Sequence, residues 1–200
     1  MPMQHVQSIL PHHGEVRYYR NFFDKEKSDL WFNVLLSEIR WKQEPVKIFG
    51  REIMQPRLTA WYGDENRDYT YSGITMNASP WIEPLAEMKH ELEKIANTTF
   101  TSALLNLYRD GNDAIGWHRD NEKMLGKEPV IASVSLGAER IFQLREYHSK
   151  SNTVSVLLEH GSLLLMSGES QQFWEHRLPR KSKLHAARIN ITFREVKQLR

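Results

Sequence analysis

The sequence contains no cysteine among its 200 residues. Disulfide bridges, thiolate zinc sites, iron–sulfur clusters and a cysteine nucleophile are therefore excluded, and any metal must be bound by His, Asp or Glu. The sequence also has no apolar run close to the roughly 18 residues that a membrane-spanning helix needs. Its first five residues lack the basic and apolar start of a secretory signal. We therefore expect a cytoplasmic protein with no membrane partner.

An excess of charge of one sign is absent except at the C-terminal end of the chain. Lysine and arginine number 27 and aspartate and glutamate 25, so the formal net charge is +2, and 40% of the residues are hydrophobic. These values are typical of a globular protein. Residues 177–200, however, contain eight Lys or Arg and a single acid, Glu195. Such a segment can face the backbone of a nucleic acid, although a solvated basic end is the simpler interpretation.

No repeat, low-complexity tract or linker divides the chain, so we interpret residues 1–200 as one domain and expect a monomer. Apolar residues recur at helical spacing over residues 28–40 and again after Ser79-Pro80, which predicts two helices. From residue 104 onward, short β-rich runs alternate with glycine-containing loops. These runs cover residues 104–108, 130–136, 140–144, 154–158, 162–166 and 187–193. The pattern predicts a mainly β fold, an antiparallel sandwich or jelly roll with flanking helices on one outer face.

A His-x-Asp motif at His118 and Asp120 is the first candidate for chemistry. In an extended segment the two side chains lie on the same side, where they can bind one metal ion. Two imidazoles and one carboxylate are the ligand set of non-haem Fe(II) oxygenases, although the same set also binds Zn²⁺. The spacing leaves the third ligand open. The candidates are His148, His160, His176 and His185.

The last β-rich run alternates polar and apolar residues, so one face of this strand carries only polar side chains. These are Arg188, Asn190, Thr192 and Arg194. If this face is turned into a jelly roll, the two arginines need a partner for their buried charge, and a dicarboxylate would supply it through bidentate pairs. Asn106 and Tyr108 repeat the alternation and add an amide and a phenol. A chelated 2-oxo acid would satisfy these groups, whereas a half-buried strand with a wet face is the simpler alternative.

Together these motifs resemble the AlkB family of Fe(II)/2-oxoglutarate-dependent dioxygenases, which reverse alkylation damage on nucleic-acid bases. The motifs are Asn106-x-Tyr108, His118-x-Asp120, a later His, and Arg188-x-Asn190-x-Thr192-x-Arg194. The resemblance runs from Tyr19 to Val196 and is greatest to the branch that repairs 1-methyladenine and 3-methylcytosine in DNA. It implies a double-stranded β-helix (jelly roll) as the catalytic core in residues 104–200, after helices and a nucleotide-recognition lid in residues 1–103.

The resemblance also implies roles for the residues of the site. His118, Asp120 and His176 would bind Fe(II) and so be the catalytic residues, because the segment from Phe173 to Pro179 matches the one that carries the third ligand in the family. Arg188 would pair with the distal carboxylate of 2-oxoglutarate. The other residues expected to support this cosubstrate are Asn106, Tyr108, Asn190, Thr192 and Arg194.

Substrate contacts are expected mainly from the lid, which spans residues 48–73. Tyr69, Tyr71 and Ser72 resemble residues that line the pocket for a flipped base, and aromatic stacking suits that role, although a Tyr-rich strand is also simply good β-sequence. Phe49 matches a hydrophobic finger that enters duplex DNA, although a loop Phe is often a packing residue. The remaining substrate residues are Arg57, Asn121 and Glu122. Asn121 stands where the branch usually has Asp, so the negative charge toward a cationic base is absent.

The activity implied by the resemblance is oxidative demethylation of 1-methyladenine and 3-methylcytosine in single- or double-stranded DNA. Fe(II), 2-oxoglutarate and O₂ would be required, and succinate, CO₂ and formaldehyde would be released. One alternative is the same chemistry on methylated RNA or on a protein side chain. A second alternative is a non-catalytic nucleic-acid-binding module that uses the basic C-terminal segment, which leaves the polar face of residues 188–194 unexplained.

Overall fold

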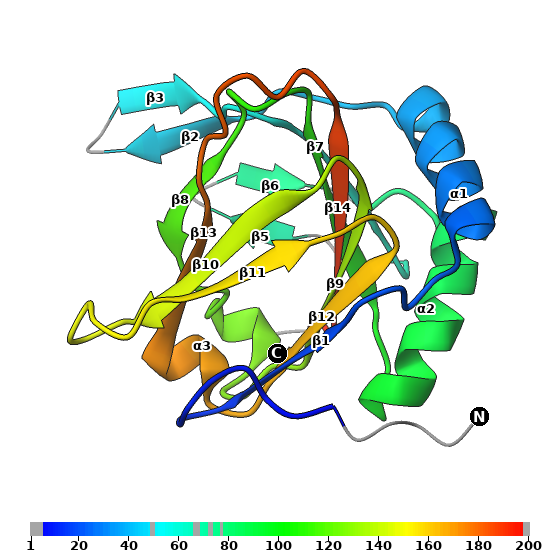
Figure 1. Cartoon of the computed structure of the whole chain (residues 1–200). Helices are drawn as coiled ribbons and strands as arrows, with labels where there is room; N and C mark the ends of the chain where they lie inside the picture. Colours follow the sequence, from blue (N-terminus) through cyan, green and yellow to red (C-terminus); the bar gives the residue numbers. More distant parts are fainter. Residues whose placement is uncertain (1–5, 49–50, 66–68, 72–73, 77, 198–200) are drawn as a thin grey trace.

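The computed structural model describes residues 6–48, 51–65, 69–71, 74–76 and 78–197. Two antiparallel sheets pack face to face and enclose a pocket between them (Figure 1). The larger sheet has the order β1 (Glu15–Tyr19), β12 (Ser162–Ser167), β9 (Ile131–Gly137), β14 (Arg188–Arg194), β7 (Ser102–Tyr108) and β4 (Leu58–Gly63). The smaller sheet has the order β11 (Val154–Leu158), β10 (Arg140–Glu146), β13 (Trp174–Leu178) and β8 (Ile115–His118). The predicted jelly-roll class is therefore confirmed.

Strand β14 lies at the centre of the larger sheet, between β7 and β9, and all its residues are buried. Its alternating pattern separates two environments, as the sequence predicts. Ile189, Ile191 and Phe193 enter the hydrophobic core beneath the helices. The polar side chains line the pocket between the sheets; they are Arg188, Asn190, Thr192 and Arg194.

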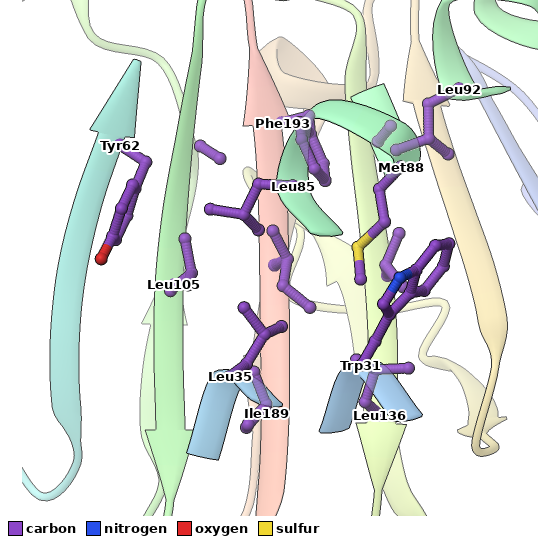
Figure 2. Close-up of a cluster of buried hydrophobic side chains, with 14 of the residues drawn as sticks. Trp31, Leu35, Tyr62, Leu85, Met88, Leu92, Leu105, Leu136, Ile189 and Phe193 are labelled. Carbon is purple, nitrogen blue, oxygen red and sulfur yellow. The ribbon is translucent and has the colours of Figure 1, made fainter. Parts of the chain in front are cut away.

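Helices α1 (Lys25–Glu38) and α2 (Glu83–Ala96) cover the outer face of the larger sheet (Figure 1). Figure 2 shows how their apolar sides meet the strands: Trp31 and Leu35 from α1 and Leu85 and Met88 from α2 lie in one cluster with Ile189 and Phe193 of β14. Both helices begin at different residues from those expected. The Asp24 side chain accepts a hydrogen bond from the Lys27 amide (2.8 Å) and so starts α1 before residue 28.

The prediction that α2 opens at Ser79-Pro80 is wrong, because Ser79 belongs to an extended segment. Its amide donates to the Trp61 carbonyl (3.0 Å) and its carbonyl accepts from the Gly63 amide (3.0 Å), which ties this segment to β4. The helix begins four residues later, with a proline in its first turn where the missing amide proton costs nothing. All six predicted β-rich runs are strands, each with boundaries within two residues of those expected.

Two short hairpins lie outside both sheets, at the two ends of the tract predicted to form the lid (residues 48–73). They pair β2 (Pro45–Ile48) with β3 (Arg51–Met54) and β5 (Tyr69–Tyr71) with β6 (Ile74–Met76). Between these hairpins the tract runs through β4, where Tyr62 and Gly63 are buried in the larger sheet. The N-terminal half therefore supplies both hairpins and also the two edge strands of that sheet, β1 and β4. Two short turns complete the fold, 3₁₀ helix η1 (Lys123–Leu125) and α3 (Ser170–Phe173).

Among the described residues, no helix is both long and apolar enough to cross a membrane.

The packing of α1 on the sheet leads to a stability prediction. Leu35 is fully buried against the sheet, whereas Leu30 on the same helix is 60% exposed. We expect Leu35→Ala to lower the free energy of unfolding by about 2–5 kcal/mol, because the cavity is only partly refilled. Leu30→Ala should change it by less than about 0.5 kcal/mol. Urea unfolding of both variants measures the difference, and equal losses would contradict this packing.

Candidate functional site

Three possible metal ligands come together where strands β8 and β13 pair. His118 ends β8, and His176 lies directly opposite it on β13, with ring centroids 4.2 Å apart. Asp120 follows β8 two residues after His118, so its carboxylate returns to the same side. The nearest ligand atoms of the three residues all lie within 4.8 Å of one another. The structure thus brings together the three residues that the sequence analysis expected to bind iron.

The protonation states of these residues suit metal binding. Burial lowers the pKa of His176 to about 3 and also lowers the pKa of His118, so both imidazoles are neutral at pH 7. Although burial by itself raises the pKa of Asp120, the nearby Arg194 guanidinium together with the two histidines holds it at about 2. Two neutral nitrogen ligands and one carboxylate are the set that first-row divalent metals bind in a facial triad.

Hydrogen bonds from outside the triad orient its members. The Nδ1 of His118 lies 2.9 Å from the Gly116 carbonyl, which leaves Nε2 as the ligand atom. Arg194 donates to Oδ2 of Asp120 (2.7 Å), and the Asp120 amide donates to the side-chain oxygen of Gln171 (3.0 Å). Gln171 lies on α3, directly before β13, so one amide connects the segments that carry Asp120 and His176. The sequence gives no pattern from which this role of Gln171 follows.

The other candidate histidines lie elsewhere in the fold. His160 Nδ1 accepts a hydrogen bond from the Gly137 amide (2.8 Å), and its Nε2 lies 3.2 Å from Asp29, so its contacts are structural. His148 contacts the rings of Tyr147 and Phe173, and His185 is exposed. In the described part of the chain, only His118, Asp120 and His176 form a group with metal-binding geometry.

The pocket that contains the triad also contains a buried cation. Arg188 is 2% exposed, donates to the Ser135 hydroxyl (2.9 Å) and contacts the Tyr108 hydroxyl. Burial lowers the pKa of Arg188 to about 10, so it remains charged at pH 7. Within the described residues no carboxylate lies in ion-pair distance of Arg188, and its Nε has no hydrogen-bond partner. A buried guanidinium without an acid favours an anionic ligand.

Other polar residues expected around the cosubstrate line the same pocket. The side-chain oxygen of Asn106 accepts from Arg57 Nε (2.7 Å), so an expected substrate residue and an expected cosubstrate residue are in direct contact. Asn190 donates to the Ser133 hydroxyl (2.7 Å), and Thr192 donates to Asn190 (3.1 Å). These two side chains therefore form a small network between β14 and β9.

The expectation that both arginines of β14 need a ligand carboxylate is correct for Arg188 and wrong for Arg194. Arg194 already pairs with Asp120, with both side chains buried. Its charge is therefore compensated within the protein by a candidate metal ligand. The basic C-terminal segment is likewise not one solvated surface, since Arg188 and Arg194 are buried while Arg180, Lys181 and Lys183 are exposed.

The residues expected to contact substrate lie in different environments, and some of them are not described by the structure. Arg57 is buried and lines the pocket, whereas Asn121 is exposed next to Asp120 and Glu122 is half-buried at the start of η1. The backbone of Tyr69 and Tyr71 forms β5, but their side chains are not described. Phe49 and Ser72 lie outside the described residues.

Trp117, next to the metal motif, neither lines the pocket nor enters the core. Its ring lies 4.0 Å from the Arg145 guanidinium and 4.5 Å from that of Arg177. Arg119, on the other side of His118, stacks on Tyr147 at 3.6 Å. Cations therefore flank the metal-ligand segment outside the pocket.

The triad geometry predicts that His176→Gln removes metal binding while the chain stays folded, because a nitrogen ligand is lost from an intact strand. Affinity for Mn(II), measured by calorimetry, should fall by more than the roughly 10- to 100-fold that loss of an outer-shell partner costs. His160→Gln, which keeps an acceptor for the Gly137 amide, should leave Mn(II) affinity within about threefold. Unchanged Mn(II) affinity in His176→Gln would refute the ligand assignment.

Comparisons with known proteins agree with this site. A family model described as the 2OG-Fe(II) oxygenase superfamily matches residues 15–194. Alpha-ketoglutarate-dependent dioxygenase alkB homolog 3 from Homo sapiens is 39% identical over 192 residues, which cover 92% of this chain and 66% of the human protein. DNA oxidative demethylase ALKBH2 from Homo sapiens is 38% identical over 188 residues, covering 89% of this chain and 72% of the relative. The chain thus spans just under two thirds of the first relative's length.

The fold has a solved counterpart as well. A structure of OsALKBH1 superposes with a TM-score of 0.65 at 17% identity, covering 90% of this chain and 97% of the other. At this identity the likeness concerns the fold alone. The family match and the relatives above extend it to the sequence, including the strands that carry the triad and Arg188. The chain therefore belongs to the 2OG-Fe(II) oxygenase superfamily and, within it, to the AlkB family of dioxygenases.

Proposed function

We propose that this protein demethylates N-alkylated bases, 1-methyladenine and 3-methylcytosine, in DNA. For each base restored, one O₂ and one 2-oxoglutarate are consumed, and one formaldehyde, one succinate and one CO₂ are released. The observation that carries the proposal is a single pocket that contains both a His-Asp-His triad and a buried arginine without an acidic partner among the described residues. The relative named a DNA oxidative demethylase supports the choice of substrate.

The residues present suit Fe(II) as the metal. His118, Asp120 and His176 would bind it through two neutral nitrogens and one carboxylate oxygen, which leaves coordination positions open. When bound together with 2-oxoglutarate and O₂, Fe(II) supplies the oxidising power for attack on an N-methyl group. The protein holds Asp120 in its ionised form through Arg194, and it keeps the His118 ring in place through the Gly116 carbonyl.

The buried end of the pocket suits a dicarboxylate. Arg188 would accept the distal carboxylate of 2-oxoglutarate, because a guanidinium in a low-dielectric site gains most from a charge-assisted pair. The Tyr108 and Ser135 hydroxyls contact Arg188 and orient its guanidinium toward that position. Because Arg188 and the metal ligands line the same pocket, the 2-oxo acid end of a diacid bound to Arg188 would point toward the triad.

Apolar side chains of the pocket would limit the access of water to the reacting methyl group. Ile115, Phe142, Met166 and Leu178 form its apolar lining, next to the imidazoles. Arg57 reaches the pocket from the segment before β4 and bonds Asn106, so it connects the lid tract to the cosubstrate end. Arg57 would therefore contact the substrate on one side and a cosubstrate residue, Asn106, on the other.

A nucleic-acid partner is supported by the charges outside the pocket. Arg119 and Arg177 flank the metal-ligand segment and stack on aromatic rings, whereas Arg145, which shares the Trp117 ring with Arg177, already pairs with Glu175 (2.6 Å). Planar guanidinium groups held in this way are pre-organised to pair with phosphates. Asn121 next to Asp120 contributes no negative charge, so attraction to a cationic base must come from other groups.

Arg188→Ala is expected to weaken 2-oxoglutarate binding about 10- to 100-fold, since a charge-assisted bond in a buried site is lost. Calorimetry on Mn(II)-loaded protein measures this affinity. Arg180→Ala, which removes an exposed arginine from the same chain segment, should leave the affinity within about twofold. Equal affinities for Arg188→Ala and the unmodified protein would refute the proposed cosubstrate pairing.

The activity itself is tested with matched single- and double-stranded oligonucleotides that carry 1-methyladenine or 3-methylcytosine. Mass spectrometry should show loss of one methylene per lesion, only when Fe(II) and 2-oxoglutarate are both present, and no loss with His176→Gln. A methylated RNA of the same sequence is the comparison substrate. RNA turnover that exceeds DNA turnover would reject DNA as the main substrate, and DNA binding without any succinate formation would reject an enzyme.

A further inference from the structure

Arg140 is a second fully buried arginine, and it does not line the pocket. It begins β10 and is 1% exposed. Its guanidinium donates to the backbone carbonyls of Asp110 (3.2 Å), Asp113 (3.0 Å) and Pro179 (2.6 Å). One side chain from the smaller sheet therefore binds the loop that follows β7 and the loop that leads into β14.

These two loops meet at one end of the barrel (Figure 1). The Gly111 amide donates to the Leu184 carbonyl (2.9 Å), and the Lys181 amide donates to the Gly111 carbonyl (2.9 Å). The strands that the loops extend, β7 and β14, pair there with Tyr108 opposite Arg188. Arg140 is thus anchored directly behind the end of the pocket that holds Arg188.

Among the described residues no carboxylate forms an ion pair with Arg140, although the charges of Asp113 and Asp110 favour its protonated form from a distance. The Asp113 carboxylate accepts from Nε (2.8 Å) and NH2 (2.9 Å) of Arg109, and the Asp110 carboxylate accepts from the Asn112 amide (2.7 Å). Backbone carbonyls satisfy hydrogen bonds but carry only partial charge, and the Nε of Arg140 has no partner in this part of the chain. A cation that is buried without an acid is costly unless an anion binds within reach of its field.

Tyr108 connects this cation to the pocket. The guanidinium carbon of Arg140 lies 5.8 Å from the centre of the Tyr108 ring, and that of Arg188 lies 5.3 Å from the same centre. The positive charge of Arg140 also contributes to the lowered pKa of Arg188, after the larger effect of burial. Two cations therefore raise the potential at one end of the pocket, where only one of them can touch a ligand.

We propose that Arg140 is a specificity-determining positioning residue for the cosubstrate: it acts through Tyr108 and Arg188, and its charge favours a ligand with a distal carboxylate over one without. The inference rests on the proposed function, in which Arg188 binds the distal carboxylate of 2-oxoglutarate. Discrimination between diacids and monoacids then depends on Arg140, a residue outside the pocket. The same guanidinium fixes both loops and thereby the positions of Tyr108 and Arg188.

The test compares two ligands that differ only at the distal end. Calorimetry on Mn(II)-loaded protein measures the affinities of 2-oxoglutarate and 2-oxopentanoate, which lacks the distal carboxylate. Arg140→Gln should weaken 2-oxoglutarate binding about tenfold, in line with a unit charge acting across several ångströms of protein. The same variant should weaken 2-oxopentanoate binding by less than about threefold. Equal weakening of both ligands, or no weakening of either, would overturn the proposal.

Two further variants separate charge from loop structure. Arg180→Gln removes an exposed charge from the loop that Arg140 binds and leaves the Arg109–Asp113 pair intact, so the preference for the diacid should be unchanged within about threefold. Arg140→Lys keeps the charge and should keep the preference, even if Arg140→Gln does not fold. Loss of the preference in Arg140→Lys would overturn the proposal. Absence of any preference in the unmodified protein would overturn the Arg188 assignment and this inference together. A normal preference that Arg140→Gln leaves unchanged would reject this inference alone.

Discussion

The structure depends on how positive charge is buried on the inner face of β14. This strand lies at the centre of the larger sheet and turns Arg188 and Arg194 into the pocket. Neither guanidinium can be left without a negative partner in such a site at low cost. Arg194 finds its partner in Asp120, and this pairing holds the carboxylate ionised beside two neutral imidazoles. Arg188 finds no such partner among the described residues, which leaves the site one anion short and suited to a carboxylate ligand.

The rest of the fold keeps that arrangement in place. The helices α1 and α2 cover the opposite face of the larger sheet, so the apolar residues of β14 have a core to enter and its polar residues must face inward (Figure 2). The smaller sheet supplies the facing wall, and the pairing of β8 with β13 sets His118 opposite His176. Gln171 on α3 and Arg140 on β10 then secure the segments around the two charged ends of the pocket.

Much of this site follows from periodicity in the sequence. The alternation in residues 188–194 predicts which side chains enter the pocket, because a strand has only two faces and the apolar one must be covered. The His-x-Asp spacing places two ligands together for the same reason. The first residues of the two helices are harder to predict from the sequence, because they depend on Asp24 as a cap and on the backbone bonds between Ser79 and β4. Neither contact has a sequence pattern strong enough to compete with the general helical period.

The remaining contacts are tertiary and have no local signal. The pairing of Arg194 with Asp120 joins residues 74 positions apart. It neutralises one of the two arginines that the sequence analysis expected to need a dicarboxylate. In the sequence, Arg140 is only the first residue of a predicted strand. Its role depends on the carbonyls of two distant loops, which accept its hydrogen bonds in the folded chain. Trp117 is adjacent to a metal ligand, yet its contacts with Arg145 and Arg177 come from neighbouring strands. Only the assembled sheets reveal these partners.

The central claim is that the pocket lacks one anion and that a 2-oxo diacid supplies it. The most direct measurement is the unfolding free energy of the unmodified, Mn(II)-loaded protein with and without saturating 2-oxoglutarate, alongside succinate and 2-oxopentanoate as partial ligands. The account predicts that 2-oxoglutarate at about 100 times its dissociation constant raises the unfolding free energy by about 2.7 kcal/mol. At the same concentrations both partial ligands should stabilise the protein much less. Equal stabilisation by 2-oxopentanoate and 2-oxoglutarate would contradict the claim.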